Sequence, residues 1–377
     1  MEGEAKALCI AAAAIGLAIA PDASLVLGCL AGIVTGLIPG LHPNTFLPMA
    51  SGTAFIIGLA VSHSFFDFLP AIMLGAPDEA TSLSVLPGHK MLLRGKALEA
   101  FRITILGGLF AGILAALFIP FLGFANQPIL VPIVLVFTLA TMLANAKHKT
   151  KTILVMIAAA FIGHHALAAN ALPAMLAGFF GTSTIIFSLA TRPVIPPQLP
   201  HAKARITHRE AALAAVAGWL AGLFPAVSPS VAAMALCPKM KHREFLAVLG
   251  GTNTVYAIAA ILAINIVGRP RSGAAIAVGR QDFLFVAGSA LAAIGISAWL
   301  AWHLSKPLVQ WFNKVNHRAA SGIALIIVVG IAGLGGTTAL AFLAVSTLVG
   351  LVCLAWGVRR STCMASLLIP VLLYYLL

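Results

Sequence analysis

The chain has 377 residues, of which 61% are hydrophobic and only 9% are charged, and its mean hydropathy is +1.05. Charged residues make up about 25% of a typical soluble domain, so this composition excludes a soluble globular protein. Apolar runs close to the roughly 20 residues that cross a bilayer as a helix recur from end to end, and the alternating pattern of a membrane β-barrel is missing. We therefore expect an all-α polytopic membrane protein in the cell (cytoplasmic) membrane.

The net charge of +13 comes from basic residues concentrated in short loops between apolar runs. These loops are 147–151, 192–209, 239–243 and 359–360. Aromatic residues do not interleave with them as on a nucleic-acid-binding surface, so we expect no nucleic-acid partner. The positive-inside rule explains the pattern, because cytoplasmic loops of membrane proteins are enriched in Lys and Arg.

Taken in chain order, the apolar runs and their Gly/Pro interruptions predict helices along the whole sequence. The predicted ranges are 5–20, 23–38, 46–62, 66–85, 97–122, 128–146, 151–168, 171–191, 209–224, 230–238, 243–267, 274–303, 320–334, 336–357 and 361–376. Three of these segments, 23–38, 46–62 and 230–238, are too short to span the hydrocarbon core of a bilayer.

A glycine recurs at every fourth position of the second segment, which is then interrupted by Pro39 and Pro43. The same pattern returns 186 residues later, where Pro225 and Pro229 match the two prolines. The small residues are Gly28, Gly32, Gly36 and Gly40 in the first copy and Ala214, Gly218, Gly222 and Ala226 in the second. Four-residue spacing puts them on one helix face, where another backbone can approach closely, so we expect those before the break to pack helices.

The Pro-rich, basic segment 192–209 separates two parts of similar length, 1–200 and 201–377, which we interpret as two transmembrane repeats. Short, Gly/Pro-interrupted segments at matching positions of two halves indicate a transporter binding site. If each repeat has an odd number of spans, the repeats are inverted and their broken helices meet at the membrane midplane. A second, looser match pairs 74–81 with 249–254.

The proline breaks predict a cavity that binds an ion or an anion. Prolines remove backbone amide donors, and the freed groups are tolerable only inside protein or against water. The polar side chains at the breaks add groups that hydrogen-bond an anion or coordinate a cation. The candidate substrate-binding residues are Pro39, Gly40, His42, Asn44 and Thr45 in the first copy and Pro225, Ser228 and Ser230 in the second. The alternative is that the hydroxyl and amide groups only cap the half-helix that follows.

Asp78 and Glu79 are the candidate cation-coupling residues. Acidic residues are scarce in this chain, and a carboxylate at membrane depth is by default a functional hypothesis. These side chains would bind Na⁺ or H⁺. The alternative is a polar turn whose carboxylates lie at a helix N-terminus.

Basic and neutral residues complete the candidate substrate site. His89 and Lys90, in a basic turn, would neutralise an anionic substrate, although a positively charged loop is the simpler explanation for the arginine and lysine that follow. In the second half, Thr252 and Asn253 occupy the region matched to Asp78 and offer uncharged oxygen and amide groups.

The sequence contains no GxxxxGK[ST], GxSxG or HExxH motif, so it indicates neither an ATP-driven pump nor a hydrolase. The five cysteines form no CxxC pair, and His164-His165 has no third metal ligand at a recognisable spacing. We therefore expect a protein that is not an enzyme and that holds no metal or cofactor other than a coupling Na⁺ or H⁺.

Three stretches resemble the TctA family, the large membrane subunits of tripartite tricarboxylate transporters, which have stand-alone archaeal relatives. They are Gly36-Leu-Ile-Pro-Gly-Leu-His-Pro-Asn-Thr45, the segment 75–81 followed by 87–97, and 357–361 leading to 367–370. The resemblance implies an anion carrier of two inverted repeats that is driven by a cation gradient. It also implies binding loops at 38–45 and 75–81, with second-half echoes at 224–231 and 250–254.

The chain is shorter than a typical large subunit and carries His42-Pro43-Asn44, as expected of the archaeal branch. That branch's substrate is not implied by the family name, and neither is a periplasmic binding-protein partner.

We hypothesise a secondary transporter that moves an anionic, carboxylate-type substrate by alternating access, coupled to Na⁺ or H⁺. The alternative is a polyprenyl-phosphate flippase, because carriers of that lipid use a similar Pro-Gly plus Ser/Thr motif at an anion site. A third hypothesis, an intramembrane enzyme or assembly subunit acting on lipid, is opposed by the repeat. The expected partners are an anionic small molecule or lipid phosphate and membrane lipids, and the sequence leaves a homodimer open.

Overall fold

The computed structural model describes residues 2–38, 41, 43, 46–47, 50–75, 81, 85–119, 130–191, 196–238 and 240–376. Across these residues the secondary structure is helical and contains no β-strand. Within the same ranges, seven helical segments are long and apolar enough to cross a membrane. They are Thr53–Leu74, Ala97–Phe118, Lys149–Ala168, Leu172–Ala190, His242–Ile266, Phe283–Lys314 and Gly336–Trp356. The all-α polytopic membrane class predicted from composition is therefore confirmed.

Most helices lie where the sequence predicts them. Those of the first half are α1 (Glu2–Ile19), α2 (Ser24–Leu37), α3 (Thr53–Phe66), α4 (Phe68–Leu74), α5 (Val85–Leu92), α6 (Ala97–Phe118), α7 (Leu130–Ala144), α8 (Lys149–Ala168), α9 (Leu172–Leu176), the π-helical η3 (Ala177–Thr182) and α10 (Ser183–Thr191). Those of the second half are α11 (His208–Leu223), α12 (Pro229–Leu236), α13 (His242–Ile266), α14 (Gly273–Val278), α15 (Phe283–Lys314), α16 (His317–Leu334), α17 (Gly336–Trp356), the 3₁₀-helical η4 (Arg360–Met364) and α18 (Ala365–Leu376).

The predicted gap between segments 46–62 and 66–85 is wrong, because α3 and α4 follow each other with only Asp67 between them. Pro70 lacks the amide that would bond to the carbonyl group four residues earlier, which explains why the helix is interrupted at this point. The polar residues around position 63 interrupt the apolar pattern in the sequence, but their side chains are buried in contacts between helices.

The predicted helix 274–303 is also wrong, because it consists of two helices and the second runs further. α14 ends at Val278, and the capping residue Gly279 has a φ of 67°, which lies in the left-handed region that favours glycine. Asp282 then caps α15, since its Oδ1 accepts hydrogen bonds of 2.9 Å from the amides of Leu284 and Phe285. α15 continues through Pro307 to its end.

The four-spaced glycines pack helices, as predicted. A Cβ atom on Gly28 would lie 2.1 Å from the carbonyl oxygen of Phe55 in α3, and one on Gly222 would lie 2.3 Å from Cβ of Ala259 in α13. No side chain fits into such gaps. Because of them, α2 lies directly against α3, and α11 lies directly against α13.

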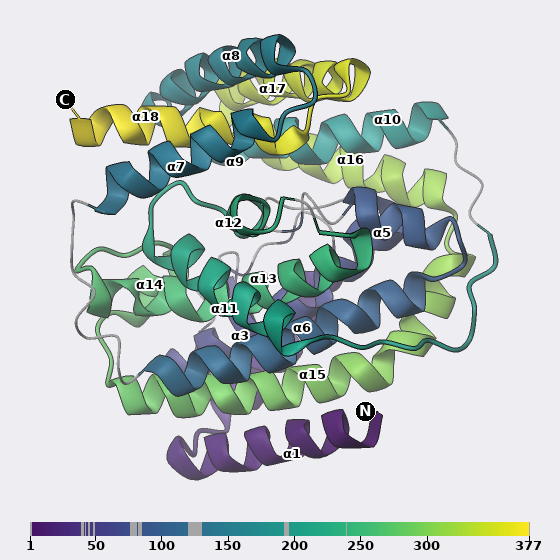
Figure 1. Ribbon diagram of the computed structural model, residues 1–377, viewed down its shortest axis with the longest axis vertical. Coiled ribbons are helices and arrows are strands. Elements are labelled where there is room, and N and C mark those ends of the chain that lie inside the picture. Colours follow the sequence, from purple (N-terminus) through teal and green to yellow (C-terminus); the bar gives the residue numbers. More distant parts are fainter. Residues whose placement is uncertain are drawn as a thin grey trace.

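The helices run roughly side by side, with α1 at one edge of the molecule and α8 and α17 at the other (Figure 1). Buried apolar residues form two large clusters. One cluster draws mainly on α1 to α6, α13 and α15, and the other on α7, α8, η3, α17 and α18. α11 and α12 contribute to both clusters. Each cluster therefore combines helices from the two halves of the chain.

The packing is reciprocal between the two halves. α6 packs against α13 while α15 packs against α3, and α8 packs against α18 while α17 packs against η3. In addition, α15 begins at Phe283, 186 residues after α6 begins at Ala97. This regularity supports the division into repeats over 1–200 and 201–377. That division and the inversion of the repeats in the membrane stay predictions.

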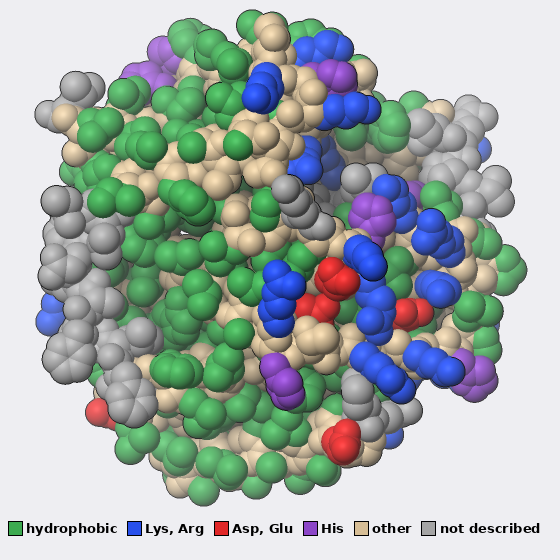
Figure 2. Space-filling model, viewed as in Figure 1, with side chains coloured by type: hydrophobic (Ala, Val, Ile, Leu, Met, Phe, Trp, Pro, Cys, Tyr) green, Lys and Arg blue, Asp and Glu red, His purple; other side chains and the backbone are tan. Residues whose placement is uncertain are grey.

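The face drawn in Figure 2 is largely hydrophobic, as expected of helices that contact lipid. Its Lys and Arg side chains gather toward one side of the view rather than spreading over the whole face. By the positive-inside rule, we expect this side to face the cytoplasm.

The substitution Gly28→Ala should destabilise the protein, because the added methyl group would meet the Phe55 backbone and force α2 away from α3. Overpacking of this kind costs about 1–3 kcal/mol. The matched control is Gly322→Ala, which lies inside α16 with nothing within 4 Å of the added methyl group. Thermal unfolding of the purified protein in detergent should show a lowered midpoint for the first variant alone, and equal midpoints would contradict this packing.

Candidate functional site

Part of the predicted site lies outside the described residues. These positions are Pro39, Gly40, His42, Asn44, Thr45, Asp78 and Glu79. The structure places the remaining predicted residues, which are His89, Lys90, Pro225, Ser228, Ser230, Thr252 and Asn253.

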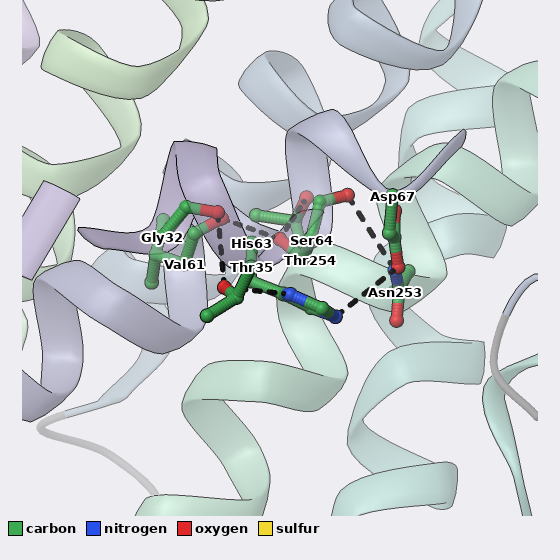
Figure 3. A network of polar contacts seen from close by, with 8 residues as sticks. All are labelled: Gly32, Thr35, Val61, His63, Ser64, Asp67, Asn253 and Thr254. Atoms are coloured by element: carbon green, nitrogen blue, oxygen red, sulfur yellow. Dashed lines mark hydrogen bonds and ion pairs between the residues drawn. The ribbon is translucent and has the colours of Figure 1, made fainter. Parts of the chain in front are cut away.

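A buried polar cluster joins α3 to α13 (Figure 3). The Nδ2 atom of Asn253 donates a hydrogen bond of 2.8 Å to Oδ2 of Asp67. One turn away, the Ser64 hydroxyl donates to the Thr254 hydroxyl at 3.2 Å. All four side chains are buried. Two contacts between buried side chains therefore connect the first half of the chain to the second.

His63 extends this cluster to α2. Its Nδ1 atom lies 3.0 Å from the Thr35 hydroxyl oxygen, and its Nε2 atom lies 3.9 Å from Oδ2 of Asp67. The Thr35 hydroxyl also donates to the Gly32 carbonyl at 3.1 Å. The His63 imidazole therefore lies between the Thr35 hydroxyl of α2 and the Asp67 carboxylate.

Asp67 and Asn253 are 186 residues apart, the same offset that relates Pro39 to Pro225. The constant offset therefore pairs Asn253 with Asp67 rather than with the region of Asp78, to which the looser match assigned it. The segment 250–254 is also not a loop, because it lies in the middle of α13. Asp67 can be found from the sequence by subtracting the 186-residue offset from position 253. Nothing in the local sequence of His63 or Thr35 indicates that they belong to the cluster.

Thr252 does not share in this contact. Its hydroxyl donates to the Val248 carbonyl of its own helix at 2.8 Å, and its side chain is fully buried. Of the two residues predicted on α13, only Asn253 reaches across to the other half of the chain.

The second predicted break is present between α11 and α12. Pro225 lies in the turn, and Ser228 caps α12, because its hydroxyl accepts from the Val231 amide at 3.4 Å. The capping alternative is thus confirmed for Ser228, and both Ser228 and Ser230 are buried. Ala226 has a left-handed φ of 62°, which is strained for a residue with a side chain. The turn therefore holds a strained backbone next to the positive end of a half-helix.

His89 and Lys90 lie in α5 rather than in a turn. The Lys90 ammonium group donates to Nε2 of His242 at 2.9 Å, at the exposed start of α13. This point is eleven residues, or roughly 16 Å of helix, from Asn253. The structure therefore does not bring Lys90 to the polar cluster.

His89 is half-buried against α4. Burial lowers its pKa below the usual value for histidine, and its contact with the Ile72 carbonyl works in the opposite direction. His89 is therefore neutral at pH 7 and would act as a hydrogen-bonding group rather than as a cation. In the described part of the chain, no group of three or more His, Cys, Asp or Glu could hold a metal ion.

Apolar spanning helices, the break between α11 and α12 and a buried carboxylate between helices are typical of a multi-pass membrane protein of the transporter type. Residues 23–365 match the tripartite tricarboxylate transporter TctA family, and the chain belongs to this family. The resemblance seen in the sequence motifs is confirmed. Because this is a family of transporters, membership supports transport rather than catalysis.

A curated relative comes from an archaeon. The chain is 26% identical over 389 residues to the "Uncharacterized protein MJ1079" of Methanocaldococcus jannaschii, covering 93% of this chain and 98% of that protein. This likeness agrees with a stand-alone archaeal type of TctA protein. No solved structure matches the chain.

The substitution Ala226→Gly should stabilise the protein, because glycine adopts the left-handed conformation at this turn without steric cost. We expect a gain of about 1 kcal/mol. The matched control is Ala212→Gly, at an exposed position inside α11, which should cost about 1 kcal/mol instead. Thermal unfolding midpoints that move in the same direction in both variants would contradict the strained turn.

Proposed function

We propose that this protein is a secondary transporter in the cell membrane that moves a carboxylate anion together with H⁺ or Na⁺ by alternating access. Membership of a tricarboxylate transporter family supports the class of substrate. The observation that carries the mechanism is the buried contact of Asp67 with Asn253, between helices of the two halves. The family match favours this function over the polyprenyl-phosphate alternative.

The coupling step follows from the cost of a buried charge. An ionised Asp67 side chain puts a negative charge inside a candidate span. A charge in such a place costs several kcal/mol unless its partners stabilise it. A proton shared by Asp67 and His63, or a Na⁺ ion beside them, removes that cost. The transporter would therefore change its access only when a cation is bound, which ties anion movement to the cation gradient.

The substrate would bind at the break between α11 and α12. Ser228 caps the N-terminus of the half-helix α12, which is its positive end, and this end attracts a carboxylate. His42, Asn44 and Thr45 remain its proposed partners from the first break, and Asp78 and Glu79 remain proposed ligands of the coupling cation. Lys90 is exposed beside His242 at the start of α13, so its charge would attract the anion to the protein rather than hold it in the binding site.

Purified protein in liposomes tests this function. Citrate uptake should be driven by an inward gradient of H⁺ or of Na⁺, and the substitution Asp67→Asn should reduce gradient-driven uptake to the rate seen without a gradient. The control Asp282→Asn makes the same chemical change at an exposed helix cap, where asparagine also serves, and should leave uptake unchanged.

The exchange variant, Asp67→Asn combined with Asn253→Asp, keeps one carboxylate and one amide at the contact and should recover part of the coupled uptake. Wild-type protein that moves no tricarboxylate under any cation gradient would disprove the proposed function. Full coupling in Asp67→Asn would instead remove only this residue from the mechanism.

A further inference from the structure

A cavity lies between the α7–α8 loop, the end of α12 and the turn from α17 into η4. Its volume is about 220 Å³, which suits a small ion or a single head group rather than a drug-sized molecule. We call it the basic pocket, and its polar residues are Asn145, Lys147, His148, Thr152, Arg359, Ser361 and Thr362.

The rim of the basic pocket is positively charged and has no acidic counterpart. Lys147, His148 and Arg359 are exposed at its edge, and no Asp or Glu is among the described residues that line it. Arg359 reaches across to α12, where its Nη1 atom lies 3.0 Å from Sδ of Met234. A thioether is a weak partner for a guanidinium group, so the charge of Arg359 stays available to an anion.

The floor of the pocket consists of buried hydroxyl groups. Thr152, Ser361 and Thr362 are only 2–3% exposed, yet their hydroxyls make no hydrogen bond within the described part of the chain. Neighbouring hydroxyls behave differently, since Ser183 and Thr184 each donate to a carbonyl one turn back in their own helix. The hydroxyls of Thr152, Ser361 and Thr362 line the cavity, where they can donate to a group that accepts hydrogen bonds.

Two further features of the structure contribute to the basic pocket. The 20-residue helix α8 begins at the pocket, so the unbonded amides of its first turn and its positive end lie next to it. Arg360 faces the other way and is buried, donating to the Phe180 carbonyl at 3.2 Å and to the Thr184 hydroxyl. This anchor fixes the turn that carries Arg359 and Ser361.

We propose that the basic pocket is a second anion site, which binds carboxylate or phosphate oxygens through Lys147 and Arg359 at the rim and the three hydroxyls at the floor. It lies toward the far end of α12 from Ser228, because Met234 belongs to its lining. It would hold an anion on the basic side of the protein, one half-helix away from the break. The choice of a tricarboxylate as a ligand rests on the proposed function.

Orientation by the positive-inside rule explains basic residues in the 147–151 and 359–360 loops. It does not explain three buried hydroxyls turned into a cavity beneath them, because that rule concerns charge in loops and not side chains below the surface. Positive charge at the rim together with hydroxyl donors at the floor of the pocket suits the binding of an oxyanion.

Acylation of Lys147 by an amine-reactive ester, followed by mass spectrometry, measures occupancy of the pocket directly. In nanodiscs of neutral phosphatidylcholine, citrate or inorganic phosphate at about ten times its dissociation constant should slow acylation of Lys147 roughly tenfold. Lys314, exposed at the end of α15, serves as the internal control and should react at an unchanged rate.

A second set of nanodiscs, containing anionic phosphatidylglycerol, separates the two sources of phosphate. Protection by citrate or inorganic phosphate in neutral nanodiscs supports a soluble ligand, and protection that appears only with phosphatidylglycerol supports a lipid head group. Either result supports the site. Equal acylation rates under all of these conditions would overturn it.

The substitution Arg359→Gln should raise the ligand concentration needed for protection by about tenfold, because it removes a charge-assisted hydrogen bond. The matched control is Arg318→Gln, at the exposed start of α16, which should leave protection unchanged. Undiminished protection in Arg359→Gln would place the ligand elsewhere and overturn the proposal. Since labelling requires no transport, a protein that fails to move citrate but protects Lys147 would disprove the proposed function alone.

Discussion

The hydrogen bond from Asn253 to Asp67 is the contact on which the rest of the structure depends. It places a carboxylate between α3 and α13, where an ionised group is costly unless it is paired. Its polar partners are Asn253 of α13 and His63, which lies one turn earlier in α3. Because these partners come from both halves of the chain, any movement of one half against the other changes the environment of this one charge.

The glycine series make such a contact geometrically feasible. Gly28 lets the backbones of α2 and α3 touch, and Gly222 does the same for α11 and α13. Each pair therefore behaves as a tight unit, and the two units meet where the polar cluster lies. At that meeting point a short side chain such as asparagine or aspartate can bridge from one unit to the other. Small residues thus bring the backbones together, and the polar residues specify how the halves align.

Local patterns predicted the helices, the glycine packing and the break at Pro225, because spacing and proline chemistry act within a few residues. They failed at α3, where buried contacts override the polar residues around position 63 and the helix continues. They also failed at Lys90, whose partner His242 comes from the other half of the chain. The role of Asp67 depends on a residue 186 positions away and was accessible only by applying the offset of the repeat to Asn253.

A double-mutant cycle on Asp67→Ala and Asn253→Ala, read out by reversible unfolding in bilayer-like conditions, tests the central contact most directly. The account predicts a coupling energy of about 1 kcal/mol, since the bond joins two buried side chains. If the two single effects instead add within about 0.3–0.5 kcal/mol, the side chains do not interact energetically and the contact cannot be the link between the two halves.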